Sequence, residues 1–445
     1  MGLTGDRMYR DYKSAKTDPT HVPSPNASFG KKKSGIPLIL LFLYLILEYS
    51  RPQELLPFLR VLRLPTVTVI LLALSILFSG GLRLREKQTV LFLSILGLMV
   101  IHGPIAVNNY WTLMIFLSMV MNFFVYLGFI HYVDDQEKYD RLLKIWIGVH
   151  VFLALVGIVK QGKGIGGFLA DENDLCMTLN MIIPLSFFLA MSASGKKKIY
   201  YIFLTGLFLF VIILSESRGG FVGLVAAFIY CFLRTKKKVI TAFIIGVLAM
   251  FAAIVAPPSY WGEVGSITEE GTQKGTGEER VYTWGIGWHM FLDNPILGVG
   301  QGNFPYVFGK YELEVTGSDE AFHGRSVAGR QAHSIYFTML PELGIIGTGI
   351  IIGMIINIFK DLKAIRFRSS EQKNKDTSPI SNNYYFLALG LEGALVAYLA
   401  SGAFISILYY PNLWILMGFV LSLKKIAIQD STDTHLSLSV FPLKT

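Results

Sequence analysis

Charged residues are scarce in this chain, while long apolar runs are abundant. Of its 445 residues, 52% are hydrophobic and only 16% are charged, and the mean hydropathy is +0.50. The charges lie in short clusters between the apolar runs, so little charge is left for a surface that faces water. This composition excludes an ordinary soluble globular protein and predicts a membrane protein.

Cysteine is nearly absent, with only Cys176 and Cys231 in the whole chain. Both fall within predicted membrane spans, where a cysteine behaves as a small hydrophobic residue. The sequence therefore predicts neither a disulfide framework nor a cysteine metal site.

A cleavable signal sequence is also not evident. The first apolar run begins near Ile36, after a polar leader with three consecutive lysines at 31–33. It continues past Leu47 without a small-residue cleavage site. We therefore expect this run to be the first membrane span.

Apolar runs recur along the chain, and a bilayer core needs about 20 apolar helical residues. We count twelve candidate spans, of which the third contains Gly103-Pro104 and the last contains Pro411. The sequence predicts an all-α integral membrane protein with about 12 transmembrane helices and a large outer loop, containing short amphipathic helices, between the ninth and tenth. The spans cover approximately residues 36–50, 64–80, 89–107, 111–130, 142–159, 175–192, 199–215, 219–233, 239–256, 335–359, 384–401 and 404–423.

Lysine and arginine give the chain a formal net charge of +9, mostly in loops beside predicted spans. Alternate loops are rich in these residues, as at 83–87, 138–144 and 196–198, whereas 102–110 and 401–404 contain none. Under the positive-inside rule this asymmetry puts both termini in the cytoplasm, although the first outer loop is an exception. The positive charge thus indicates topology rather than a nucleic-acid surface. The expected organisation is a polar leader (1–35), spans one to nine (36–256), the outer loop (257–333), spans ten to twelve (334–425) and a tail (426–445).

The outer loop contains the stretch EERVYTWGIGWHMFLDNPILGVGQGNF. Apolar side chains from Val281 to Phe291, including Trp284 and Trp288, recur there at helical spacing, and the DNP sequence then ends the pattern. We expect an amphipathic helix that begins at about Arg280 and that either packs on the bundle or lies at the membrane interface.

A glycine-rich segment, Gly298-Val-Gly-Gln-Gly302, follows this helix. Its spacing is similar to that of a phosphate-binding loop. However, no strand precedes it and no helix clearly follows it, so a flexible turn is expected rather than a nucleotide site.

Three polar residues stand out at the outer ends of predicted spans. Arg218 lies in a minimal turn between two spans, Arg280 begins the amphipathic helix, and His333 precedes the tenth span. Taken singly, each arginine is explained by snorkelling toward lipid headgroups and the histidine by helix capping. All three map to the outer face, beside the polar stretch LADENDLC, and together they indicate a functional site.

The motifs around these residues resemble those of a known family. SRGGFVGL, an ER leading into FLDNPILGVGQGNF, and AHSIYFTMLPELGIIG occur in an order similar to that of the O-antigen ligase and Wzy-type polymerase superfamily of bacterial envelope glycosyltransferases. The resemblance extends from about Gly167 to Gly347, with weaker support from EYSRPQELLPFL. One departure is that His333 is followed by Ser334, where the family usually has an asparagine.

This resemblance implies transfer of a glycan from an undecaprenyl diphosphate carrier to a hydroxyl group, without a metal or nucleotide cofactor, at the periplasmic face of a bacterial inner membrane. It implies that Arg218 and Arg280 bind the diphosphate, because guanidinium groups match phosphate geometry. His333 would be the general base for the acceptor hydroxyl, and direct displacement would invert the anomeric configuration. Expected partners are the lipid-linked donor, a glycan hydroxyl acceptor and membrane lipids. Candidates for supporting roles are Asn173, Ser217 and Glu342.

The sequence leaves the acceptor open. Transfer to lipid A-core would make the protein an O-antigen ligase, which the long outer loop and the match around His333 favour. Transfer to a growing glycan would make it an O-antigen or exopolysaccharide polymerase, and transfer to a protein would make it a protein O-glycosylation ligase.

The site residues also have competitors. His102, His289 and His323 are expected on the outer side too, and each is an alternative to His333 as the base. The acidic stretch 171–174 could hold a divalent ion. However, carboxylates crowded beside an anionic donor would repel it unless a cation were present.

A proton-coupled transporter is the rival class, because about twelve spans with both ends inside is also a transporter layout. Glu392, within a predicted span, is either a proton relay or a polar contact that joins two helices. The lack of a recognisable repeat between the two halves of the chain argues against transport.

Overall fold

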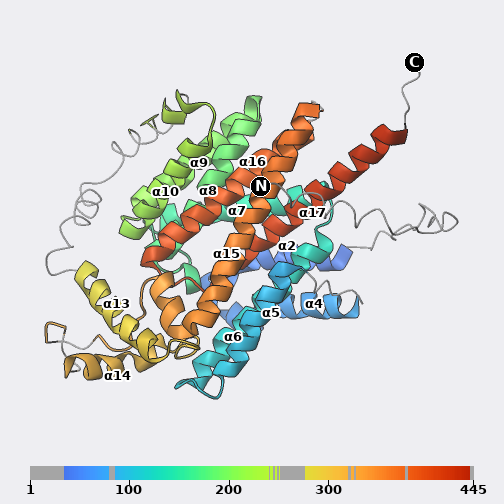
Figure 1. The fold of residues 1–445 in the computed structure, drawn as a ribbon. Coiled ribbons are helices and arrows are strands. Elements are labelled where there is room, and N and C mark those ends of the chain that lie inside the picture. The colour runs from blue at the N-terminus through green and yellow to red at the C-terminus, as the bar shows by residue number, and fades with distance from the viewer. Residues whose placement is uncertain are drawn as a thin grey trace, which may run out of the picture. The chain divides into compact units, whose positions relative to one another are not determined.

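The computed structural model describes residues 35–79, 86–239, 241–243, 246–247, 250, 276–318, 322–324, 327–375 and 379–440. Helices make up the architecture of these residues, and no β-sheet occurs among them (Figure 1). The protein is an all-helical integral membrane protein, as predicted. The elements are α2 (Gly35–Ser50), α3 (Pro52–Leu55), η1 (Pro57–Leu62), α4 (Leu64–Phe78), α5 (Lys87–His102), α6 (Asn109–Tyr132), α7 (Gln136–Val159), η2 (Gly167–Leu169), α8 (Glu172–Ser192), α9 (Gly195–Leu214), α10 (Arg218–Arg234), α13 (Thr276–Asp293), α14 (Phe304–Thr316), α15 (Ile335–Lys375), α16 (Pro379–Ser401), η3 (Gly402–Phe404) and α17 (Pro411–Val440).

Nine helical segments of the described residues are long and apolar enough to cross a membrane, and the shorter α5 is also apolar. The expected ninth span, 239–256, lies mostly outside the described residues. The count of twelve spans therefore stays a prediction, as do the domain boundaries drawn from it. The nine segments are Gly35–Leu55, Pro57–Phe78, Asn109–Tyr132, Gln136–Val159, Glu172–Ser192, Gly195–Leu214, Ile335–Glu371, Asn383–Phe404 and Pro411–Ile428.

Two helices end or begin at other residues than predicted, and a proline explains each difference. α5 ends at His102 rather than at 107, because Pro104 lacks the backbone N–H that would continue the helix. α17 begins at Pro411 rather than at 404, because the fixed φ of proline suits the first helical position.

α8 and α16 pack against each other, with α10 beside them, and small residues permit the close approach. A Cβ atom at Gly393 of α16 would lie 2.4 Å from the Cβ of Pro184 in α8. A Cβ atom at Gly223 of α10 would lie 2.0 Å from Ser401 Oγ at the end of α16. Close backbone packing of this kind stabilises helices in a bilayer, where the surrounding lipid is as apolar as the side chains.

Glu392 is buried in α16 and forms ion pairs with two arginines. Arg234 at the end of α10 contacts one carboxylate oxygen, and Arg366 Nη2 of α15 lies 2.8 Å from the other. A buried carboxylate without such partners is strongly unfavourable. The pairs explain how a membrane helix carries this residue and give the transport alternative no support.

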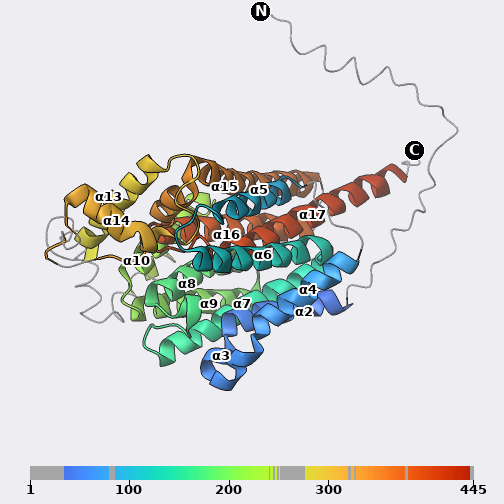
Figure 2. The ribbon, with the colours of Figure 1, turned by 90° about the horizontal axis from the view of Figure 1, so that it is seen from below.

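α13 and α14 lie side by side at one end of the bundle, where α10 and α15 begin (Figures 1 and 2). The three polar residues singled out in the sequence lie at the start of α10, near the start of α13 and in the segment before α15. This end of the bundle is therefore where the candidate site is built.

Candidate functional site

α15 is interrupted near its beginning. Gly344 has φ 59° and ψ −168°, so Ile335–Lys375 consists of two helical segments joined at a kink, with Pro341 just before it. A break in a membrane helix frees backbone groups, and these must find partners inside the protein.

The glycine-rich part of the outer loop supplies those partners. Residues 295–300 lie along residues 341–346, and the amides of Val299 and Gly300 donate to two carbonyls before the kink at 2.8 and 3.0 Å. After the kink, two amides of α15 donate to two carbonyls at the start of the loop segment at 2.8 and 3.3 Å. The kink and the loop thus form one unit.

This contact is close enough to require glycine on both sides. A Cβ atom at Gly344 would lie 2.4 Å from the carbonyl oxygen of Ile296, and one at Gly298 would lie 2.5 Å from the carbonyl carbon of Glu342. Both glycines have positive φ, a region that other residues rarely adopt. The motifs NPILGVG and LPELG are therefore two halves of one structural feature.

Two expectations about the Gly298–Gly302 segment are wrong. The segment is a packed connection held by backbone hydrogen bonds rather than a flexible turn. A helix, α14, does follow it, with Pro305 in its first turn. The local glycine content predicted a conformationally flexible backbone. The hydrogen-bond partners that restrict it lie about forty residues further along the chain, in α15.

Glu342, one of the predicted supporting residues, is buried and binds this segment. Its Oε2 accepts hydrogen bonds from the Gly302 amide at 2.8 Å and the Tyr409 hydroxyl at 2.7 Å. Its Oε1 accepts a bond from the Phe304 amide at 3.1 Å, which satisfies a free N–H of the first turn of α14. Glu342 thus joins the outer loop to α15 and to the turn before α17.

His102, a competing candidate for the base, also anchors the loop. Its ring is buried, with Nδ1 2.5 Å from Gln301 Oε1 and Nε2 2.8 Å from the Leu297 carbonyl oxygen. Gln301 Nε2 in turn donates to the carbonyls of Met99 and Thr112 at 3.1 and 3.2 Å. Because both ring nitrogens are engaged and buried, His102 is not placed to accept a proton from a substrate.

Replacing Gly344 with alanine should lower the midpoint of thermal unfolding of the detergent-purified protein. The backbone strain alone is worth about 1–3 kcal/mol, and the added methyl group would also push the loop carbonyl away. Gly349→Ala is the matched control, because it lies in the same helix and nothing is within 4 Å of its added Cβ. Equal midpoints for the two variants would show that the kink does not need glycine.

α13 holds the segment that contains His333. Trp284 Nε1 donates to the carbonyl of Ala332 at 2.7 Å, and its indole stacks on Phe337 of α15 with 4.9 Å between ring centroids. His333 lies between these two contacts, with φ 45°. Histidine enters this left-handed region more readily than most residues. α13 thus positions His333 through the contacts of Trp284 on either side of it.

The buried face of α13 differs from the predicted stripe. Ile286 and Met290 are buried, whereas Val281 and Trp288 are 65% and 46% exposed. Of the predicted stripe, Trp284 packs against Phe337 of α15 and the segment before it. The helix ends at Asp293 as predicted, although it starts earlier than expected.

Arg218 is presented by the tight turn between α9 and α10. Ser217 Oγ accepts a bond from the Gly220 amide at 2.8 Å and donates to Asn173 Oδ1 at 2.6 Å. The backbone and side-chain nitrogens of Asn173 both donate to an Asp171 carboxylate oxygen, at 2.7 and 2.8 Å. This network fixes the first residue of α10, whose N-terminus favours a bound anion.

A polar pocket of about 750 Å³ opens beside this turn. Its three cationic side chains, Lys163, Arg218 and Arg280, come from the loop after α7, from α10 and from α13. Two carboxylates, Glu172 and Glu216, also line it. A pocket of this size with three converging cations suits a ligand that carries several phosphate oxygens.

His333 is adjacent to this pocket rather than part of its lining. Arg280 connects the two: its guanidinium lines the pocket, lies 5.8 Å from the ring centroid of Phe404, and acts electrostatically on His333. The imidazole is solvent-accessible but partly covered by protein. This partial burial lowers its pKa, and the charge of Arg280 lowers the pKa further, while Asp171 opposes both effects. The ring is therefore neutral near pH 7 and able to accept a proton.

The structure brings most of the predicted site residues together. Glu342, predicted as a supporting residue, does not line the pocket and is buried against the adjoining loop. His333 does not line the pocket either, but it interacts electrostatically with Arg280, which does. The predicted residues that line the pocket are Asn173, Ser217, Arg218 and Arg280.

Sequence reasoning missed Lys163. The available signal was a lysine in an expected outer loop, on a face that is otherwise poor in positive charge. Its distance in sequence from both arginines hid the relation, which depends on the loop after α7 folding against the α9–α10 turn. A Cβ atom at Gly162 would lie 2.2 Å from Ser215 Cα, which shows how closely these two turns pack.

The remaining alternatives lie elsewhere. His289 is exposed on α13, and His323 Nε2 is 3.0 Å from Glu278 Oε1; neither lines the pocket. Within the part of the chain that the structure describes, no group of three His, Cys, Asp or Glu side chains is arranged to hold a metal ion. In the acidic stretch 171–174, the Asp171 carboxylate binds Asn173 instead.

Comparison with known proteins relates one region of the chain to a known family. Residues 203–352 match the sequence model of a family described as O-antigen ligase, and this region contains Arg218, Arg280, His333 and the kink of α15. A search of curated proteins gives no significant match. Residues 203–352 are thus similar to the O-antigen ligase family, and the resemblance of the chain to the O-antigen ligase and Wzy-type polymerase superfamily is confirmed.

Proposed function

We propose that this protein transfers a glycan from undecaprenyl diphosphate to a hydroxyl group of lipid A-core at the periplasmic face of the inner membrane. The observation that carries the proposal is the convergence of Arg218 and Arg280 on one polar pocket, with His333 beside Arg280. The family match over residues 203–352 supports an enzyme that acts on lipid-linked glycans.

The donor would place its diphosphate in the pocket. Cleavage of the sugar–phosphate bond leaves an anionic diphosphate, and neutralising that charge lowers the barrier. Arg218 and Arg280 supply fixed guanidinium groups that bind phosphate oxygens through paired hydrogen bonds. In this proposal the arginines and the N-terminus of α10, rather than a metal ion, stabilise the leaving group.

The acceptor would be activated by His333. The acceptor oxygen bonds to the anomeric carbon while the bond between that carbon and the diphosphate oxygen breaks, and the hydroxyl proton passes to the neutral imidazole. The products are the glycosylated acceptor with inverted configuration, undecaprenyl diphosphate, and a protonated His333 that releases its proton to water. Asn173 and Ser217 are positioning residues, since they hold the turn that carries Arg218.

The test is a transfer assay with purified protein, undecaprenyl diphosphate-linked glycan and lipid A-core, in the presence of EDTA. Glycosylated lipid A-core is the expected product. Lengthened glycan on the carrier would make the protein a polymerase, and glycosylated protein substrate would make it a protein O-glycosylation ligase. No transfer to any acceptor, or transfer that requires added Mg²⁺, would overturn the proposal.

The transfer rate should fall on the acid side, with an apparent pKa below the ordinary histidine value of about 6.5. The base must be neutral, and both partial burial and Arg280 lower the pKa of His333, so activity persists to a lower pH than an ordinary histidine would allow. Arg280→Gln removes a positive charge and should move this acid limb to higher pH, whatever its effect on the plateau rate.

The control for the pH experiment is Arg218→Gln, because the charges with the largest effect on the pKa of His333 are those of Arg280, Asp171, Arg330 and Glu279. This variant should lose activity without moving the acid limb. If the acid limb lay at the same pH in wild type and in Arg280→Gln, Arg280 would not shift the pKa of the general base.

Lys163→Ala should raise KM for the donor by about two- to fivefold with little change in kcat, because a partly exposed charge contributes up to about 1 kcal/mol. Lys160→Ala is the matched control, from the same loop but outside the pocket lining. Steady-state kinetics with varied donor would check the prediction; an unchanged KM would remove Lys163 from donor binding.

A further inference from the structure

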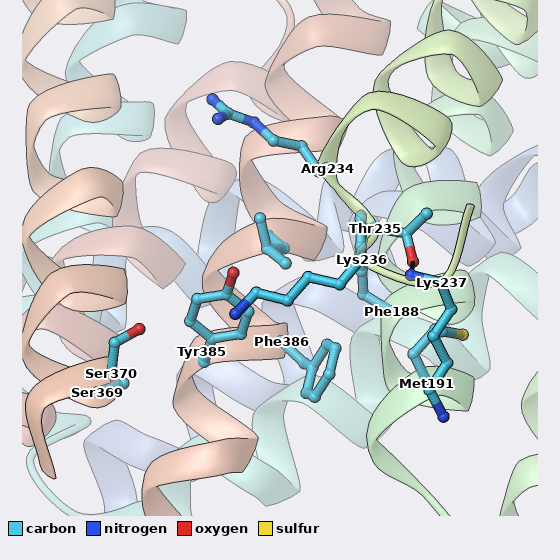
Figure 3. Close-up of a pocket in the computed structure, with 11 residues that line it drawn as sticks. Phe188, Met191, Arg234, Thr235, Lys236, Lys237, Ser369, Ser370, Tyr385 and Phe386 are labelled. Carbon is cyan, nitrogen blue, oxygen red and sulfur yellow. Dashed lines mark hydrogen bonds between the residues drawn. The ribbon is translucent and has the colours of Figure 1, made fainter. Parts of the chain in front are cut away.

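A second pocket lies at the other end of α10. The helix begins at Arg218, beside the first pocket, and ends at Arg234, which lines a second pocket of about 350 Å³ (Figure 3). A helix of 17 residues is about 25 Å long, close to the thickness of the hydrocarbon core. α8, a candidate membrane span, likewise lines the first pocket at Glu172 and the second at Met191, so the two pockets lie toward opposite sides of the membrane.

One wall of the second pocket, formed by α8 and α16, is apolar. Phe188 and Met191 come from α8, and Phe386 and Leu389 come from α16. Both helices are candidate membrane spans, and these residues lie near their ends on the side where α10 ends. This wall is suited to the upper part of an acyl chain or to a glycerol backbone.

The remaining lining is cationic and polar. Lys236 and Lys237 follow α10 directly, and Ser370 of α15 and Tyr385 of α16 supply hydroxyl groups. Figure 3 shows the side chain of Lys236 extending in the direction of Tyr385, while Arg234 points away from the other labelled residues. Apolar and cationic surfaces therefore meet in one pocket at the end of α10.

The nearby positive charges divide into two groups. Arg234 is engaged with Glu392 and lies over the ring of Tyr230, 5.6 Å from its centroid. Lys238 Nζ donates to the carbonyl of Leu233 at 2.9 Å, near the end of α10. By contrast, no carboxylate of the described residues pairs with Lys236 or Lys237, and none lines the pocket. Lys236 and Lys237 thus line the pocket without a compensating anion from the protein.

We propose that this pocket binds the phosphodiester headgroup of an anionic glycerophospholipid from the leaflet opposite the glycan-transfer site. The two lysines match the charge of the phosphate, and the hydroxyls of Ser370 and Tyr385 add hydrogen-bond donors. Basic pockets between membrane helices recognise anionic headgroups in this way. The apolar wall favours a lipid over a free phosphate, because a free phosphate ion has no apolar part to pack against it.

The test compares lipids on the full-length protein in detergent. Phosphatidylglycerol should raise the midpoint of thermal unfolding, and phosphatidylcholine, which has no net charge, should not. In a titration with fluorescent phosphatidylglycerol, the double variant Lys236→Ala, Lys237→Ala should bind about thirtyfold more weakly, from about 1 kcal/mol per lysine.

Two further variants separate binding from misfolding. Lys236→Arg with Lys237→Arg keeps both charges and should retain the affinity, whereas Lys196→Ala with Lys198→Ala removes two lysines from the start of α9, outside the pocket, and should have no effect. Equal stabilisation by the two lipids, or equal loss in both alanine double variants, would overturn the proposal. If inorganic phosphate reproduced the stabilisation and displaced the lipid, the pocket would be a site for the free ion instead.

Discussion

Replacing His333 with alanine should lower kcat for glycan transfer by about 10²–10⁴, the usual contribution of a general base, with little change in donor affinity. The reason is geometric as well as chemical. His333 lies beside Arg280 but outside the lining of the cationic pocket, so under the proposed function it would act on the acceptor rather than on the diphosphate. Single-turnover transfer rates and a separate donor-binding titration would measure the two effects independently.

The sharper variant at this position is His333→Asn. Residue 333 has a φ of 45°, which is unfavourable for alanine but which asparagine adopts readily. The backbone strain in His333→Asn should therefore be much the same as in wild type. Asparagine cannot accept the proton, and the loss of rate should persist. His289→Ala serves as the control, because His289 is exposed on α13 away from the pocket. A His333→Asn enzyme with normal turnover would remove the imidazole from the mechanism.

Arg218→Ala should reduce kcat/KM by about 10²–10³, which is typical for removal of one group that stabilises developing negative charge. Arg218 is the first residue of α10, so under the proposed function its guanidinium and the N-terminus of the helix would stabilise the same diphosphate. Arg218→Lys should recover only part of the loss, because an ammonium group does not reproduce the paired hydrogen bonds of a guanidinium.

Two comparisons would make the Arg218 result specific. Arg60→Ala removes an exposed arginine that pairs with Glu54 and does not line the pocket, so transfer should be unaffected. Ser217→Ala keeps the charge but removes the hydroxyl that joins the turn to Asn173, so it should give a smaller loss than Arg218→Ala. Wild-type kinetics in Arg218→Ala would exclude this residue from diphosphate binding.

The positions of the membrane helices and of three polar residues were accessible from the sequence alone. A membrane helix satisfies its own backbone hydrogen bonds, so length and apolarity in a continuous segment are sufficient to predict it. Arg218 and His333 were identifiable because polar residues at the ends of apolar segments are costly and few. The end of α13 was predictable because Asp293-Asn294-Pro295 acts locally.

Only the tertiary structure decided how these parts meet. The kink at Gly344 and the segment 295–300 satisfy each other's backbone groups, so neither half shows its function locally. Glu342, predicted as a supporting residue, accepts a hydrogen bond from the first turn of α14, and Lys163, which the sequence did not single out, lines the pocket. Periodicity and charge are properties of neighbouring residues, whereas hydrogen bonding across a helix break and convergence of charge in a pocket depend on residues brought together by folding. For that reason the sequence alone determined that the protein is built of apolar membrane helices and which polar residues were candidates, and the packing of distant segments determined the geometry of the site.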